Sequence, residues 1–238
     1  MEQVLHLGDL TVDVIRKDIK NLHLSVHPPT GRIRIAAPQT LEIDAIRAYA
    51  ISRMAWIRTS QRKLLAQPRE TTREYLDREN HFVWGERVLL QVRHHGGPPS
   101  VHLEHRSLLL NARADMSRDE RHQIVEGWYR DILRSAAEPV LARWQSHLGV
   151  KAAGLFLQRM KTKWGSCNTV SRNVRLNTEL AKKPPECLNY VVLHELAHLL
   201  EGTHSDRFFS ILDRSLPQWR EARRLLNSLP LGLSPARI

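Results

Sequence analysis

The segment His194-Glu195-Leu196-Ala197-His198 holds the residues of this chain that are best suited to chemistry. Histidines at positions i and i+4 of a helix lie on one face, one turn apart, so both imidazoles can reach a single metal ion. Glu195 is rotated by about 100° from its neighbour around such a helix, where its carboxylate can reach a metal-bound water without being a ligand. The spacing therefore predicts a metal site with a general base beside it.

A third histidine follows at a distance that would complete this site. A catalytic zinc ion uses three protein ligands and one open position. Gly202 is expected to end the helix and turn the chain sharply, so that His204 points back toward His194 and His198. Metzincin proteases close a three-histidine site with such a turn, but here Glu201 occupies their glycine position and no Met-turn follows. We therefore predict that His194, His198 and His204 bind zinc, with a related closure of the site.

The chemistry expected of such a site is hydrolysis of a peptide bond. Zinc would acidify its bound water, and Glu195 would take the proton as the metal-activated water attacks, then pass it to the leaving amine. The chain has only two cysteines, Cys167 and Cys187, too few for paired CxxC ligands or a disulfide framework. A metal must therefore be held mainly by histidines or carboxylates.

The composition excludes several other classes of protein. Of the 238 residues, 42% are hydrophobic and 26% are charged, which excludes wholesale disorder and collagen-like repeats. No run of 18 apolar residues is present, so we expect no membrane span. The first six residues do not open a secretory signal, and we therefore expect a cytoplasmic protein with reduced thiols.

The net charge of +11 is concentrated toward the predicted site. Residues 1–150 carry 22 basic and 18 acidic groups, a net of +4, whereas residues 151–238 carry 14 and 7, a net of +7. Such a field favours phosphates, nucleic acid or an acidic polypeptide, although a solvated basic surface accounts for it equally well. The excess lies in residues 159–183, where only Glu179 opposes Arg159, Lys161, Lys163, Arg172, Arg175, Lys182 and Lys183.

Hydrophobic periodicity indicates the elements that must position these residues. Period-two alternation predicts strands within residues 3–37, with a turn at 28–31, and helical spacing predicts one amphipathic helix over 41–66. Ser117 and Glu120 form a capping-box pattern that opens a helix to Gly149, which Pro139 would kink or split. A polar linker is expected at 69–78, strands at 82–84, 88–92, 101–103, 108–110, 155–160 and 174–177, and helices at 186–201, 206–216 and 218–228. No repeat of 20–50 residues is apparent.

Short motifs spread over the chain accompany the predicted site. They are Ala36-Ala37-Pro38, Met54-Ala55-Trp56-Ile57, the run from Arg159 to Cys167 with Trp164-Gly165-Ser166-Cys167 at its end, Leu176-Asn177-x-x-Leu180, Tyr190 to His198, His204-Ser205-x-x-Phe208 and Leu216-Pro217-x-Trp219. Together they resemble the YgjP-like metallopeptidases, which are zincins related to the SprT-type proteases. The resemblance covers nearly the whole chain, and it implies His194, His198 and His204 as zinc ligands and Glu195 as the catalytic base.

The same resemblance places a turn before the zinc helix, where an oxyanion donor is expected. Trp164 and Asn168 are candidates, although packing between strands suits Trp164 better. Cys167 is expected to be a small buried residue rather than a nucleophile or a ligand. Tyr190 lies one turn before His194, where approach to the site and packing in the core are equally compatible with its position.

We expect an α+β fold with two regions. A β-rich lobe with one amphipathic helix would span residues 1–115, and a zincin-like helical lobe with a small sheet would span residues 116–238. A cleft between them would hold an extended peptide, which could pair with an edge strand at 155–160 or 174–177.

Two functions compete with a zinc-dependent metallopeptidase. A metal-dependent nucleoside triphosphate hydrolase would hold phosphates on the basic run, but the chain lacks a Gly-x4-Gly-Lys-Ser/Thr loop. A DNA-associated binding module with a vestigial zinc site would use the basic excess, but no helix-turn-helix or finger spacing is evident. A chelator and Glu195→Gln would abolish cleavage by a peptidase, whereas a DNA module would lose binding steeply with salt and be indifferent to Glu195.

Overall fold

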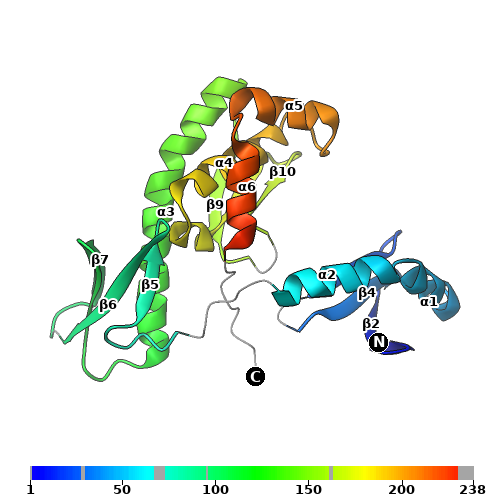
Figure 1. The fold of residues 1–238 in the computed structure, drawn as a ribbon, viewed down its shortest axis with the longest axis horizontal. Helices are drawn as coiled ribbons and strands as arrows, with labels where there is room; N and C mark the ends of the chain where they lie inside the picture. The colour runs from blue at the N-terminus through cyan, green and yellow to red at the C-terminus, as the bar shows by residue number, and fades with distance from the viewer. Residues whose placement is uncertain (1, 28–29, 67–72, 95, 161–162, 230–238) are drawn as a thin grey trace. The chain divides into compact units, whose positions relative to one another are not determined.

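A computed structural model describes residues 2–27, 30–66, 73–94, 96–160 and 163–229 of the chain (Figure 1). Strands dominate the N-terminal part and helices the C-terminal part, so the predicted α+β class is confirmed. The chain divides into two compact units, with the break between Arg69 and Glu70. The predicted boundary after residue 115 falls inside the second unit, and a functional division at that point stays a prediction.

The first unit combines a four-stranded sheet with two helices. Its strands lie in the order β1-β2-β4-β3, and only β2 and β4 run parallel. Alternate residues such as Val12, Val14 and Ile35 are completely buried, as the period of two predicts. The elements are β1 (Glu2–Leu7), β2 (Leu10–Lys17), β3 (His23–His27), β4 (Arg32–Pro38), α1 (Ile43–Ser52) and α2 (Met54–Ala66).

Two local predictions for this unit meet different outcomes. The hairpin of β3 and β4 is confirmed, with Gly31 at a φ of +76° in its turn, while Pro28 and Pro29 lie outside the described residues. The prediction of one helix over 41–66 is wrong, because the helix is interrupted at Arg53, whose N–H donates to the carbonyls of Tyr49 and Ala50. The apolar stripe of this segment is nevertheless buried in the core.

The second unit begins with a sheet that repeats the first. Its strands are β5 (Asn80–Val83), β6 (Glu86–His94), β7 (Ser100–Glu104) and β8 (Ser107–Ala112). They lie in the order β5-β6-β8-β7 with only β6 and β8 parallel, which is the arrangement of the first sheet. The arrangement of strands is thus repeated at a spacing longer than the 20–50 residues over which the sequence shows no repeat. The two sheets share pairing and alternation, and few identical residues are needed to specify either.

Helix α3 (Arg118–Leu148) follows this sheet and packs against it in one core. Both hydrogen bonds of the predicted capping box between Ser117 and Glu120 are present, and Gly149 ends the helix at a φ of +65°. Pro139 does not split the helix. Tyr75, from the predicted linker, is buried here, with its hydroxyl 2.6 Å from Nδ1 of His122. None of the described helices has the length and hydropathy needed to cross a membrane.

The remaining elements carry the predicted site. A three-stranded sheet lies in the order β10-β11-β9, with β11 antiparallel to β10 and parallel to β9. The elements are β9 (Gly154–Gln158), β10 (Gly165–Asn168), β11 (Asn173–Asn177), the 3-10 turn η1 (Thr178–Lys182), α4 (Pro185–Ala197), α5 (Asp206–Ser215) and α6 (Trp219–Ser228).

Candidate metal centre

Helix α4 places the first two histidines. Pro185 occupies its first turn, where a missing N–H costs no hydrogen bond, and Leu188, Val192 and Leu196 are almost completely buried. The helix ends at Ala197, four residues before the predicted end. His198, its C-cap, still has φ −63° and ψ −20°, so its imidazole stays one turn from that of His194.

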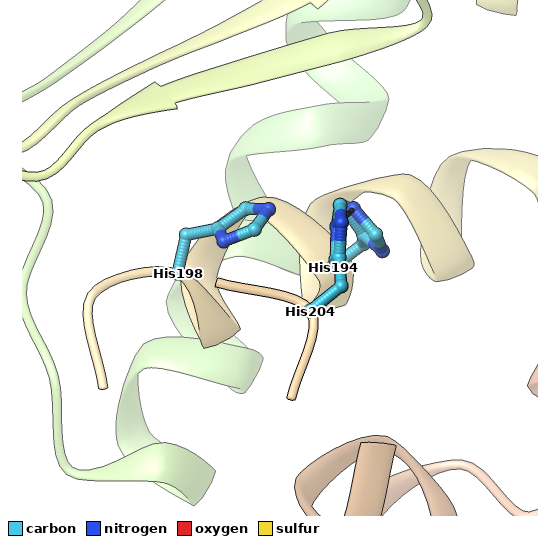
Figure 2. A group of neighbouring side chains, drawn as sticks. All are labelled: His194, His198 and His204. Atoms are coloured by element: carbon cyan, nitrogen blue, oxygen red, sulfur yellow. Dashed lines mark hydrogen bonds between the residues drawn. The ribbon is translucent and has the colours of Figure 1, made fainter. Parts of the chain in front are cut away.

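The three predicted histidines come together at the end of α4 (Figure 2). Their ligand nitrogen atoms all lie within 4.8 Å of one another, and Nε2 of His204 is 3.1 Å from Nε2 of His194. Two imidazole nitrogens on one tetrahedral zinc ion lie about 3.4 Å apart. Small side-chain rotations would therefore bring all three to that spacing.

Phe208, on α5, forms the apolar wall of this group. Its ring centroid lies 5.0 Å from that of His194, 4.7 Å from that of His198 and 4.8 Å from that of His204, and the side chain is fully buried. One side chain therefore restricts the rotamers of all three imidazoles. Phe208 belongs to the sequence motif His204-Ser205-x-x-Phe208, but its contact with all three histidines could not be predicted from that motif.

Hydrogen bonds leave the Nε2 atoms of two histidines available. Nδ1 of His198 lies 3.3 Å from the main-chain carbonyl oxygen of Glu201, and Nδ1 of His194 lies 3.4 Å from the hydroxyl of Tyr190. An N–H at Nδ1 held in this way fixes the tautomer with a free lone pair on Nε2. Tyr190 thus both packs in the core, stacked on Trp219, and contacts the site.

Burial favours the neutral form of these imidazoles. It lowers the pKa of His194 to about 3, with smaller contributions from the charges of His198, His204 and Arg223. Burial also lowers the pKa of His198. A metal ligand must be an unprotonated imidazole, so the environment favours the form that binds metal.

The loop that carries His204 is held by Glu201 and not by a glycine turn. The Glu201 carboxylate accepts hydrogen bonds from the hydroxyl of Thr203 at 2.9 Å and from its N–H at 3.3 Å. These bonds lower the pKa of Glu201. The role predicted for Gly202 is wrong, because its φ lies outside the left-handed region and a Cβ there would meet nothing within 4 Å.

The Glu195 side chain is buried against strand β10. Burial raises the pKa of its carboxyl to about 7, while Lys163 and the main-chain N–H of Cys167, which donates to the carboxyl, act in the opposite direction. The strand comes so close because Gly165 has no side chain. A Cβ at this position would lie 2.6 Å from Oε1 and 2.7 Å from Cγ of Glu195. Gly165 thus shapes the position of the predicted base.

A cavity of about 420 Å³ opens onto His194, Glu195, His198 and His204. Trp164 and Cys167 line it from the turn before β10 and from β10 itself, and Arg223 lines it from α6. The Cys167 thiol is half-buried, not fully buried as predicted, and burial raises its pKa to about 11. It is therefore a protonated thiol at neutral pH and a poor nucleophile.

Asn168, the other predicted oxyanion donor, does not line this cavity. Its Oδ1 accepts hydrogen bonds from the N–H groups of Val170 and Ser171, at 3.0 and 2.8 Å, which is an Asx turn at the end of β10. The residue shapes the loop between β10 and β11, and its candidacy as an oxyanion donor is corrected. Trp164 faces the cavity, with Nζ of Lys183 lying 5.8 Å from its ring centroid.

The basic run of residues 159–183 is not a continuous surface. Lys182 and Lys183 are almost fully buried, with exposures of 8% and 3%. Nζ of Lys182 lies 3.0 Å from the Glu179 carboxylate and 3.2 Å from that of Glu126. Arg159 also approaches Glu179, at 3.7 Å. Much of the charge counted in the sequence is thus compensated inside the second unit, and Lys161 lies outside the described residues.

Comparison with known proteins identifies the family of the chain. A model of the YgjP-like metallopeptidase domain matches residues 20–229, so the chain belongs to the YgjP-like metallopeptidase family. The zymogen of abylysin, a metallopeptidase from Pyrococcus abyssi, is similar at 21% identity over 41% of this chain and 99% of that chain, with a TM-score of 0.37. The zymogen of jannalysin, a metallopeptidase from Methanocaldococcus jannaschii, is similar at 22% identity over 38% and 86%, with a TM-score of 0.35. No curated protein sequence matches the chain.

Proposed function

We propose that this protein is a zinc-dependent metallopeptidase in which His194, His198 and His204 hold the metal ion and Glu195 is the general base. The convergence of three imidazoles beside a buried carboxylate carries this proposal. Membership of the YgjP-like family supports a metallopeptidase, and therefore a hydrolase that uses a divalent metal.

The donor set supports zinc in particular. Magnesium and calcium prefer oxygen ligands, whereas imidazole suits zinc and other late first-row metals. Three histidines with an open fourth position are a known catalytic zinc set. The hydrogen bonds at Nδ1 of His194 and His198 support binding through Nε2, as does the neutral state of both rings.

Zinc bound at this set would polarise the scissile carbonyl and acidify the attacking water. Glu195 accepts the proton of that water and later delivers it to the leaving amine. Burial raises the pKa of Glu195 to about 7 in the metal-free protein, and a bound cation nearby would lower it toward the ionised form that accepts a proton. The main-chain N–H of Cys167 donates a hydrogen bond to this carboxyl, and Gly165, which has no side chain, leaves room for it. Together they fix the position of the carboxyl during proton transfer.

The substrate would be a protein or an extended peptide that binds along β10. In its sheet, β10 pairs with β11 on one side and has no described strand on the other. Three residues of β10, Gly165, Ser166 and Cys167, line the cavity together with the preceding Trp164. An unpaired strand edge can add a further strand through main-chain hydrogen bonds. Residues 174–177, which were predicted as one possible edge, form the central strand β11 and are fully paired, whereas β9 is an edge.

Metal content and cleavage, measured on the same preparations, test this proposal. We expect wild type to bind about one equivalent of zinc and to cleave unstructured protein, and His204→Ala to lose both. Glu195→Gln should keep zinc and lose at least about 100-fold in kcat, because it cannot accept the proton. The exposed Glu186→Gln on the same helix and His102→Ala on β7 are the matched controls. A zinc-loaded Glu195→Gln variant with full activity would refute the assignment of the base.

No observation favours either competing function over this one. Both need phosphates to lie along residues 159–183, where two of the seven basic residues are buried. We further propose a cytoplasmic location, which agrees with two free cysteines, Cys167 and Cys187.

A further inference from the structure

Two cationic side chains line the cavity beside the histidines. Lys163 comes from the segment before β10, and Arg223 comes from α6, sixty positions later in the chain. The charge of Lys163 acts on Glu195 and His198, and the charge of Arg223 acts on His194. The two cations therefore approach the metal centre from two different walls of the cavity.

Neither cation forms an ion pair with an acidic side chain among the described residues, although the charge of Lys163 acts on Glu195. Other basic residues of this region do form ion pairs. Arg220, one turn before Arg223 on α6, pairs with Asp213, and Lys182 pairs with Glu179. The Arg223 guanidinium lies 5.9 Å from the ring centroid of Trp219, so an aromatic face and not a carboxylate supports it. Two like charges left facing one cavity repel each other, and an anion bound between them would relieve that repulsion.

The cavity holds one acidic side chain, and it is not free to neutralise these cations. Glu195 is 6% exposed, and its carboxyl accepts a hydrogen bond from the N–H of Cys167. The rest of the lining includes the apolar side chains Val191 and Leu226. A concave surface whose exposed charges are positive concentrates its field on an anionic ligand, and the apolar side chains can contact the stem of that ligand.

We propose that this cavity is a subsite for a carboxylate of the peptide substrate, bound between Lys163 and Arg223 beside the scissile bond. The proposal rests on the function proposed above and narrows its substrate class to peptides that present a carboxylate close to the cleavage point. Two sources share this chemistry: an Asp or Glu side chain, and the C-terminal carboxylate of the substrate.

A nucleic acid is a poorer match for the same charges. A phosphate backbone is a row of anions and requires a row of exposed cations to follow it. Around the cavity that row is interrupted, because Lys182 and Lys183 are buried and Arg220 is ion-paired. Two cations that line one concave site match a single carboxylate.

Matched peptides test the subsite. One series carries Glu, Gln or Lys at each position around the cleavage point, and a second carries either a free or an amidated C-terminus. We expect the zinc-loaded enzyme to prefer a carboxylate over the matching amide by about 10-fold in kcat/KM, in one of the two series. Arg223→Gln and Lys163→Gln should each reduce that ratio to about 3-fold, and the double variant should abolish it. Arg223→Glu should reverse the preference, so that the Lys peptide is cleaved with a higher kcat/KM than the Glu peptide. In the wild-type enzyme the preference for the carboxylate should decrease as the salt concentration is raised.

The control is Arg224→Gln, which removes another exposed arginine from the adjacent position of α6, outside the cavity lining. It should keep the wild-type ratio, which separates a local contact from a general effect of net charge. A variant that merely unfolds would lose cleavage of both members of a peptide pair and leave their ratio unchanged.

Binding provides a second readout that does not need turnover. The Glu195→Gln protein is titrated with labelled Glu and Gln peptides, and with free and amidated peptides, by fluorescence anisotropy. Tighter binding of the peptide that carries the carboxylate, if it is lost in the Arg223→Gln, Glu195→Gln protein, supports the subsite. This result supports it even if no peptide is cleaved, in which case only the proposed function fails. Equal binding and equal cleavage of both peptides in every pair would overturn the subsite. Displacement of the labelled acidic peptide by oligothymidylate at a lower concentration than unlabelled acidic peptide would overturn it as well.

Discussion

Gly165→Ala removes nothing from the protein and adds one methyl group where the structure has no room. The new Cβ would lie 2.6 Å from Oε1, 2.7 Å from Cγ and 2.9 Å from Cδ of Glu195. Carbon atoms in contact ordinarily stay about 3.5 Å apart, so Cγ of Glu195 must move away by about 0.8 Å. Gly165 is buried and paired with Leu176 of β11, and α4 is packed in the core, so the flexible Glu195 side chain is the part that yields.

A displacement of about 1 Å at a catalytic group costs about 100-fold in rate. We therefore expect Gly165→Ala to lose about 100-fold in kcat, which corresponds to about 2.7 kcal/mol of transition-state stabilisation, with little change in KM. Zinc content should stay at the wild-type level, because none of the three histidines is displaced. A general loss of folding would instead lower zinc content and the thermal midpoint together.

The assay compares kcat, KM, zinc content and thermal midpoint in four proteins: wild type, Gly165→Ala, Glu195→Gln and the double variant. If both substitutions act through the same carboxyl, the double variant is no slower than Glu195→Gln alone. Gly127→Ala on α3 is the matched control, because a Cβ there meets nothing within 4 Å and the residue does not line the cavity, and it should keep the wild-type kcat. A folded, zinc-loaded Gly165→Ala enzyme within about threefold of wild type would refute the steric reasoning.

Two further predictions concern the support of the site and the core. Tyr190→Phe removes the hydroxyl that lies 3.4 Å from Nδ1 of His194. We expect zinc affinity, measured by competition with a chelator, to fall about 10-fold or more. Unchanged affinity would contradict a role of Tyr190 in orienting His194. Burial lowers the pKa of His81 to about 3, so the unfolded chain binds more protons between this value and about 6.5, and the free energy of unfolding falls as pH decreases below 6.5. In metal-free protein His81 alone contributes about 2 kcal/mol to the loss at pH 5 relative to pH 8, and urea unfolding of wild type and His81→Asn at both pH values measures this contribution as the difference between the two proteins.

The parts of the site that could be predicted are those set by spacing along one helix. His194 and His198 lie together because four residues make one helical turn, and this holds even where the helix ends at its C-cap. The capping box at Ser117 is equally local. Such features need only a few neighbouring residues, so periodicity is sufficient to find them.

The predictions that failed concern single side chains whose hydrogen-bond partners hydrophobic periodicity does not reveal. Gly202 was expected to turn the loop that carries His204, yet the Glu201 carboxylate and Thr203 hold that loop. Asn168 was expected to face the site, yet its side chain closes its own turn. The predicted linker at 69–78 includes the break between the two units, but part of it is anchored in the second unit, because Tyr75 is buried and contacts His122 on α3.

The electrostatic field at the site illustrates why charge counts along a sequence are a poor guide. Lys182 and Glu179 are three residues apart in η1, and burial turns them into an ion pair that adds little field outside the core. Lys163 and Arg223 are far apart in sequence, yet β10 and α6 bring both to one cavity. A charge count over residues 159–183 includes the buried Lys182 and omits Arg223, which lines the cavity. The charges that a substrate would meet are therefore selected by packing and not by their density along the chain.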